Sequence, residues 1–65
     1  MKNTVIYNPT AGMFDGTVNG KVVSRCNTVR AVVRTLVHRY GAERITSTEV
    51  DIRKEVTKAK KEFAS

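Results

Sequence analysis

The chain has 65 residues and carries 12 Lys and Arg against 6 Asp and Glu, a net charge of +6. This length fits one small domain over residues 1–65. One Cys and one His exclude a disulfide framework and a Cys/His zinc site, and the length excludes a multidomain enzyme. A domain of this size has a small core, so we expect a homodimer or a complex with a partner to stabilise it.

The cellular compartment can be predicted from Cys26 and from the lengths of the apolar runs. Cys26 fits a small buried hydrophobe in a reducing compartment, with an intermolecular disulfide or a redox sensor as the alternative. The apolar run before Asn8-Pro9 is only Val5–Tyr7, whereas a secretory segment needs ~7–15 apolar residues and a membrane span ~20. We therefore expect a soluble cytoplasmic protein without a membrane partner.

The first 26 residues form the β region of the predicted fold. Strand-forming residues predict a strand over 3–8, which ends at Asn8-Pro9. A β-hairpin is predicted over 13–26, because Asn19-Gly20 best tolerates the positive φ angles of a two-residue type I′ turn.

The hairpin turn also predicts which side chains share a face. It places Val18 opposite Lys21 and Thr17 opposite Val22. Neither face is wholly polar, so we expect helices to cover one face and a partner to engage the other. Regular alternation groups one face as Phe14, Val18, Lys21, Val23 and Arg25, and the other as Met13, Asp15, Thr17, Val22, Ser24 and Cys26.

Residues 27–65 form a two-helix region. The first helix is predicted over 27–40, with Asn27 or Thr28 as its cap and Gly41 at its end. Its apolar stripe is Val29, Val32, Val33, Leu36, Val37 and Tyr40.

A second helix is predicted over roughly 48–63, with Ser47 as its cap or Thr46 and Glu49 as a capping box. Lys58 and Glu62 are expected to pair on its exposed face. Residues 50–52 form a short strand in the alternative interpretation. The buried stripe is predicted to be Ile52, Val56, Ala59 and Phe63. The expected fold is therefore α+β, with about three strands in a meander, followed by two amphipathic helices that pack on a single sheet layer.

The positive charge is concentrated in the first two-thirds of the chain. Residues 1–42 hold six basic side chains and Asp15 as their one acid, whereas residues 43–65 hold six basic and five acidic side chains. Arginine presents a planar fork of donors that suits phosphate and guanine edges. We predict binding to nucleic acid, to DNA rather than RNA, with a merely solvated basic surface as the alternative. The predicted binding residues are Lys21, Arg25, Arg30, Arg34, His38 and Arg39.

Two short stretches of the chain resemble known families. Residues Val5–Gly12 resemble the strand and phosphate loop of diacylglycerol-kinase-type lipid kinases, which implies backbone amides that face nucleotide phosphates. In that family a helix follows the glycine directly, whereas this chain predicts a hairpin there. Lys21–Arg25 followed by two helices is similar in order to the ribbon-helix-helix repressors, which implies a basic strand in the major groove. Neither resemblance assigns the chain to a family.

We predict no enzymatic activity, cofactor or metal site, because no nucleophile and carboxylate can be placed beside His38. The predicted function is a small, non-enzymatic nucleic-acid-binding protein that contacts phosphates through the hairpin and the first helix. The alternative is an inhibitor or adaptor that docks on an acidic protein surface, with Met13, Phe14 and Val22 as apolar anchors.

Overall fold

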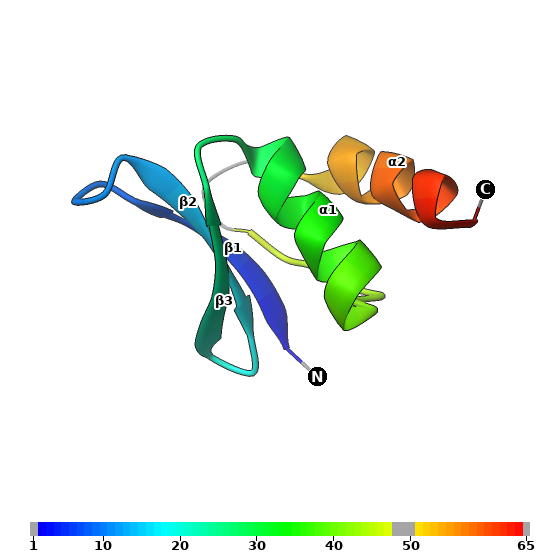
Figure 1. The fold of residues 1–65 in the computed structure, drawn as a ribbon, viewed down its shortest axis with the longest axis horizontal. Helices are drawn as coiled ribbons and strands as arrows, with labels where there is room; N and C mark the ends of the chain where they lie inside the picture. The colour runs from blue at the N-terminus through cyan, green and yellow to red at the C-terminus, as the bar shows by residue number, and fades with distance from the viewer. Residues whose placement is uncertain (1, 48–50, 65) are drawn as a thin grey trace.

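The secondary-structure elements follow one another in the predicted order (Figure 1). The computed structural model describes residues 2–47 and 51–64. The predicted α+β fold is confirmed: three antiparallel strands in the order β1-β2-β3 are followed by two helices. The elements are β1 (Asn3–Asn8), β2 (Met13–Val18), β3 (Lys21–Cys26), α1 (Val29–Tyr40) and α2 (Arg53–Ala64).

The β2–β3 turn has the predicted geometry. Asn19 and Gly20 both adopt positive φ angles, 54° and 82°. The turn pairs Val18 with Lys21, as expected from a two-residue loop.

A β-bulge in β3 overturns the predicted faces of the hairpin. Gly16 pairs with Ser24, but Thr17 pairs with Val22, so Val23 is an extra residue without a partner in the ladder. One extra residue shifts every later side chain to the opposite face. Three assignments of the alternation were therefore wrong: Ser24 lies opposite Gly16, Arg25 opposite Asp15, and Cys26 opposite Phe14.

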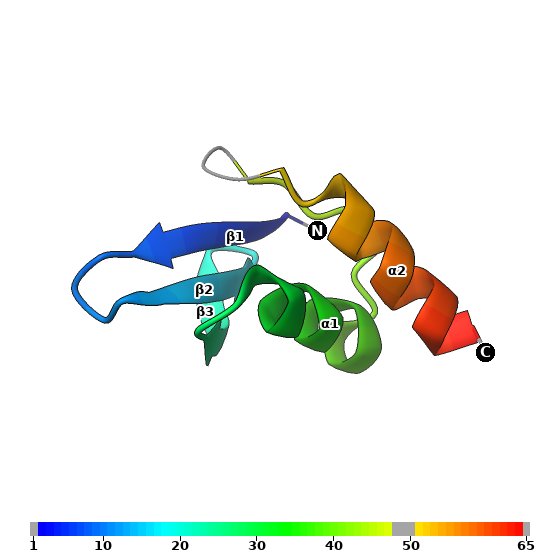
Figure 2. The same cartoon turned by 90° about the horizontal axis from the view of Figure 1, so that it is seen from above.

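One face of the sheet is covered by α1, whereas α2 packs on α1 and contacts no strand among the described residues. Figure 2 shows α1 against the sheet and α2 against α1. A Cβ on Gly16 would lie 2.7 Å from a Val32 methyl and 3.3 Å from Leu36, so α1 approaches β2 closely. The buried apolar core consists of Val5, Val32, Val33, Leu36, Val37, Ala42, Ile52 and Ala59.

The opposite face of the sheet is open in the part of the chain that the structure describes. Ile6, Met13 and Val22 share this face and are 47%, 38% and 48% exposed. We call this surface the open sheet face. Phe14, predicted as an apolar anchor beside Met13 and Val22, instead packs against the core on the helix side.

α1 begins two residues later than predicted and ends where predicted. The hydroxyl of Thr28 accepts the Ala31 amide N–H at 3.2 Å, so Thr28 and not Asn27 is the cap. Gly41 follows with a left-handed φ of 63°, and its N–H bonds to the Leu36 carbonyl.

The start of α2 was predicted wrongly. Thr46 is not a capping residue: it forms a parallel bridge to Thr4, and its carbonyl accepts the Val5 N–H at 3.0 Å. The helix begins at Arg53, whose N–H bonds to the Asp51 carboxylate at 3.1 Å. Ile52 is buried without being part of a helix or a strand. The predicted roles of Glu49 and Val50 lie outside the described residues.

The turn after β1 leads to a strand and not to a helix. The Asn8 side-chain oxygen accepts the backbone N–H groups of Thr10 and Ala11, and Gly12 adopts a φ of 65° before β2 begins. This geometry departs from the lipid-kinase pattern, in which a helix follows the glycine.

Candidate nucleic-acid interface

α1 carries three arginines and no acidic side chain. Its buried stripe includes Val32, Val33 and Leu36, so the remaining arc of the helix carries its polar residues. The valines are poor helix formers, and packing of this stripe on the sheet and on α2 holds the helix in place. The arginines are thus presented by a helix whose orientation is set by the core.

Arg30 and Arg34 lie on the flank of α1 that faces α2. Both approach Glu62: Arg30 Nη2 lies 3.9 Å from one carboxylate oxygen, and Arg34 Nε lies 3.4 Å from the other. The sequence predicted no acid near these arginines and paired Glu62 with Lys58, so the cross-helix pairing is a correction. Two positive charges share one negative charge, and the arginine side chains stay 68% and 57% exposed.

Arg39 lies on the other flank of α1. It follows Val32 by seven residues and Leu36 by three, and these two side chains contact the sheet at Gly16. Residues three, four and seven apart share one side of a helix, so Arg39 lies toward the sheet. Its side chain is exposed, and it forms no ion pair within the described residues.

Lys21 extends this basic surface onto the sheet. It pairs with Val18, which packs against the core, so Lys21 lies on the same side of the sheet as α1. β3 leads into α1 through a short connection, and α1 returns along the sheet, which brings its C-terminal end to the end where the β2–β3 turn lies (Figure 1). Lys21 is exposed and lies at that end.

Arg25 is separated from the other predicted binding residues. Because of the bulge it lies on the open sheet face, where its Nε donates to Asp15 Oδ1 at 2.7 Å. Asn8 also donates to this carboxylate, at 3.3 Å. The hydrogen bond from Arg25 lowers the pKa of Asp15 from its ordinary value of 3.8, and the carboxylate raises the pKa of Arg25 in turn. Arg25 therefore already has a counter-charge within the chain.

His38 belongs to the contact between the helices. Its Nε2 donates to the Ala59 carbonyl at 3.0 Å, and its ring lies 5.4 Å from the ring of Phe63. His38 Nε2 is thus engaged within the chain, at the contact between α1 and α2.

Two small residues between the arginine flanks were missed by the sequence reasoning. Ala31 and Thr35 lie on the arc opposite the buried stripe, and both are half-buried. The Thr35 hydroxyl donates to the Ala31 carbonyl at 3.0 Å, which turns its polar atom back onto the helix. Their spacing of four residues, out of phase with the apolar stripe, was the signal available in the sequence. We define the α1 face as Lys21, Arg30, Ala31, Arg34, Thr35 and Arg39.

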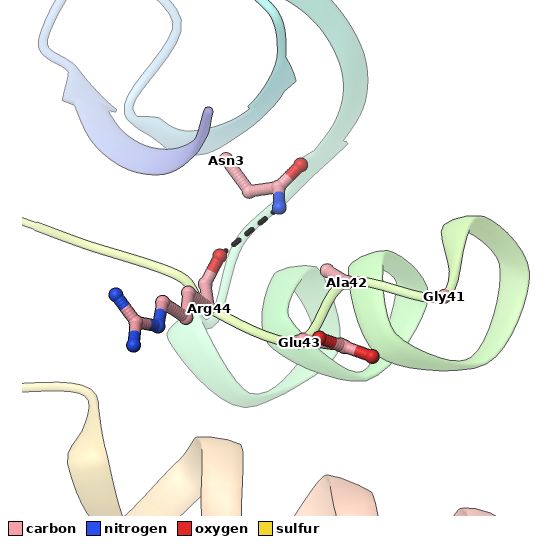
Figure 3. Close-up of a pocket in the computed structure, with 5 residues that line it drawn as sticks. All are labelled: Asn3, Gly41, Ala42, Glu43 and Arg44. Atoms are coloured by element: carbon pink, nitrogen blue, oxygen red, sulfur yellow. Dashed lines mark hydrogen bonds between the residues drawn. The ribbon is translucent and has the colours of Figure 1, made fainter. Parts of the chain in front are cut away.

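A hollow of about 390 Å³ lies where the chain leaves α1, and Figure 3 shows the residues that line it. The Asn3 amide donates to the Arg44 carbonyl at 3.0 Å, while the Arg44 side chain extends away from Asn3. The Asn3 side-chain oxygen is buried without a partner. The residues around the hollow join β1 to the connection after α1. They are Asn3, Gly41, Ala42, Glu43 and Arg44.

Other chemistries have few residues to support them in the described ranges 2–47 and 51–64. No cluster of three His, Cys, Asp or Glu side chains suitable for a metal ion occurs there. Cys26 is a free thiol, half-buried, with the Ser24 hydroxyl 3.7 Å away. Neither described helix is long and apolar enough to span a membrane.

We found no protein-family model, curated protein or solved structure that matches this chain.

Proposed function

We propose that this protein binds nucleic acid without catalysing a reaction, and that the α1 face contacts phosphates. The observation that carries the proposal is the excess of exposed guanidinium groups on α1. Arg30 and Arg34 share one carboxylate and remain more than half exposed, and Arg39 has no ion-pair partner among the described residues.

A phosphate backbone can supply the missing counter-charge. Arginine pairs with phosphate through parallel N–H donors, and such charge-assisted bonds are stronger than neutral ones. Arg30 and Arg34 are one helical turn apart, roughly 6 Å, so they can engage one phosphate or two neighbouring phosphates. Glu62 is 35% exposed and can release either arginine when a phosphate replaces it.

The test is a fluorescence-anisotropy titration of duplex and single-stranded oligonucleotides at several salt concentrations. If Lys21, Arg30, Arg34 and Arg39 each neutralise one phosphate, log K for duplex DNA should fall with log salt at a slope of about −3.6. Arg34→Ala and Arg39→Ala should each reduce this slope by about 1.

Arg53→Ala is the matched control for these variants. Arg53 is also exposed, but it forms a two-point pair with Asp51 at 3.0 and 3.1 Å, away from the α1 face. Its removal should leave the salt slope unchanged. A folded wild-type protein that binds no duplex or single strand at low salt contradicts the proposal.

A second candidate function is docking on a partner protein, and the open sheet face favours it. Ile6, Met13 and Val22 are exposed there around the Asp15–Arg25 pair. Its exposed large side chains are apolar and its ion pair is closed, so this face suits an apolar partner surface better than the acidic surface first expected. A stoichiometric protein that stays bound after nuclease treatment, lost in Met13→Ser, would favour this function.

A further inference from the structure

The side chains of the α1 face are short at its centre and long at its flanks, which is the shape that suits a helix in a groove. Its centre, Ala31 and Thr35, is small, and the Thr35 hydroxyl donates to the Ala31 carbonyl, so its polar atom is already bonded within the helix. The longer basic side chains stand on both flanks, Arg30 and Arg34 toward α2 and Arg39 toward the sheet. A flat basic surface, by contrast, would carry its long side chains at the centre as well.

We propose that α1 lies in the major groove of duplex DNA, with Ala31 and Thr35 toward the base pairs and the two arginine flanks on opposite phosphate backbones. This inference rests on the proposed function and specifies the nucleic acid that is bound, duplex DNA. The major groove of B-DNA is about 12 Å wide and 8.5 Å deep and admits an α-helix. The 12 residues of α1 span about 18 Å, which is sufficient to cross it.

The same geometry disfavours other nucleic acids. The major groove of A-form RNA is deep and too narrow for side chains to read, and a single strand offers no two facing backbones. A minor groove about 6 Å wide cannot admit a helix. The central methyl groups can contact thymine methyls but offer no donor or acceptor pair, so the sequence preference should be weak.

Charge complementarity favours the α1 face over the open sheet face for this partner. Among the residues of β1, β2 and β3, the open sheet face carries one basic side chain, Arg25, and Asp15 neutralises it. The α1 face carries four basic side chains, whose one ion-pair partner within the described residues is Glu62.

A matched pair of substitutions tests the position of the helix. Thr35→Met keeps the charge and introduces a better helix former, but its longer side chain fills the centre of the α1 face. Thr57→Met on α2 is its control, because Thr57 makes the same hydroxyl bond to a carbonyl four residues earlier, also at 3.0 Å. Thr35→Met should weaken binding to duplex DNA about tenfold, and Thr57→Met should not change it. Equal affinities of the two folded variants overturn the inference.

Two measurements on the unaltered protein keep the inference testable if Thr35→Met does not fold. A minor-groove ligand such as netropsin should leave binding to duplex DNA unchanged, and duplex RNA of the same sequence should bind about tenfold more weakly than the DNA. Competition by netropsin, or equal affinity for RNA, overturns the major-groove position while the proposed nucleic-acid function stands. If the unaltered protein binds neither DNA nor RNA, the proposed function itself is contradicted.

Discussion

Gly16 shows how a single residue sets the distance between the layers. It lies in β2 directly beneath α1, where an added Cβ would lie 2.7 Å from the Val32 methyl. Its φ angle is not in the left-handed region, so space and not backbone conformation requires glycine here. Leu36 and Val32 are both fully buried, and neither can move aside freely.

Gly16→Ala is expected to destabilise the protein by about 1–3 kcal/mol, because the added methyl overpacks the contact with α1. Urea unfolding followed by circular dichroism measures this loss. The double variant Gly16→Ala/Val32→Ala should lose less than the sum of the two single variants, since the shortened side chain at position 32 leaves room. Additive losses would show that the methyl is not in contact with Val32.

At the level of single elements, α1 is defined by its two ends. Thr28 satisfies the free amide of Ala31, and Gly41 closes the last turn in a left-handed conformation. These two caps determine where the helix that carries Arg30, Arg34 and Arg39 begins and ends. α2, in contrast, begins only where Asp51 can accept the N–H of Arg53, after the connection has paired with β1.

Thr28→Ala should lower the free energy of unfolding by about 0.5–2 kcal/mol, because the Ala31 amide loses its partner at the helix start. Asn27→Ala is the adjacent control, exposed and not the cap, and should change stability little. Chemical denaturation of both variants checks the difference. If Asn27→Ala proves the more destabilising of the two, the assigned cap is wrong.

For the whole molecule, the ion pairs predict how stability depends on pH. Both paired aspartates have lowered pKa values: Asp15 through its hydrogen bond from Arg25, and Asp51, to about 2, through hydrogen bonds from Arg53. The unfolded chain returns both to about 3.8. The unfolded state then binds more protons at low pH, so each pair stabilises the fold above pH 3.8 and ceases to do so as pH falls through the folded pKa.

The unfolding temperature should therefore fall as pH is lowered from about 5 to 2, and the fall should be smaller in Asp15→Asn and in Asp51→Asn. Differential scanning calorimetry across this range checks the prediction. Because Asp51 is 64% exposed, solvent weakens its pair, and added salt should reduce its share of the pH dependence. An Asp15→Asn variant with the full acid sensitivity of the wild type would contradict the assigned ion pair.

Local sequence rules were sufficient wherever the deciding residues are neighbours in the chain. The Asn19-Gly20 turn, the apolar stripe of α1 and its closing Gly41 all act within one or two turns of backbone, so their patterns predicted the hairpin and the helix. The concentration of arginines in α1 was equally visible, since it needs only the residue types and the helical period.

Contacts between distant residues decided the rest. The bulge at Val23 arises from how β3 pairs with β2, and it alone moved Arg25 to the open sheet face, where Asp15 neutralises it. Glu62 meets Arg34 only because the core packs α2 beside α1, and no rule of spacing links two residues on separate helices. Chain composition thus established the positive charge, while packing and strand register determined which of those charges remain available to a partner.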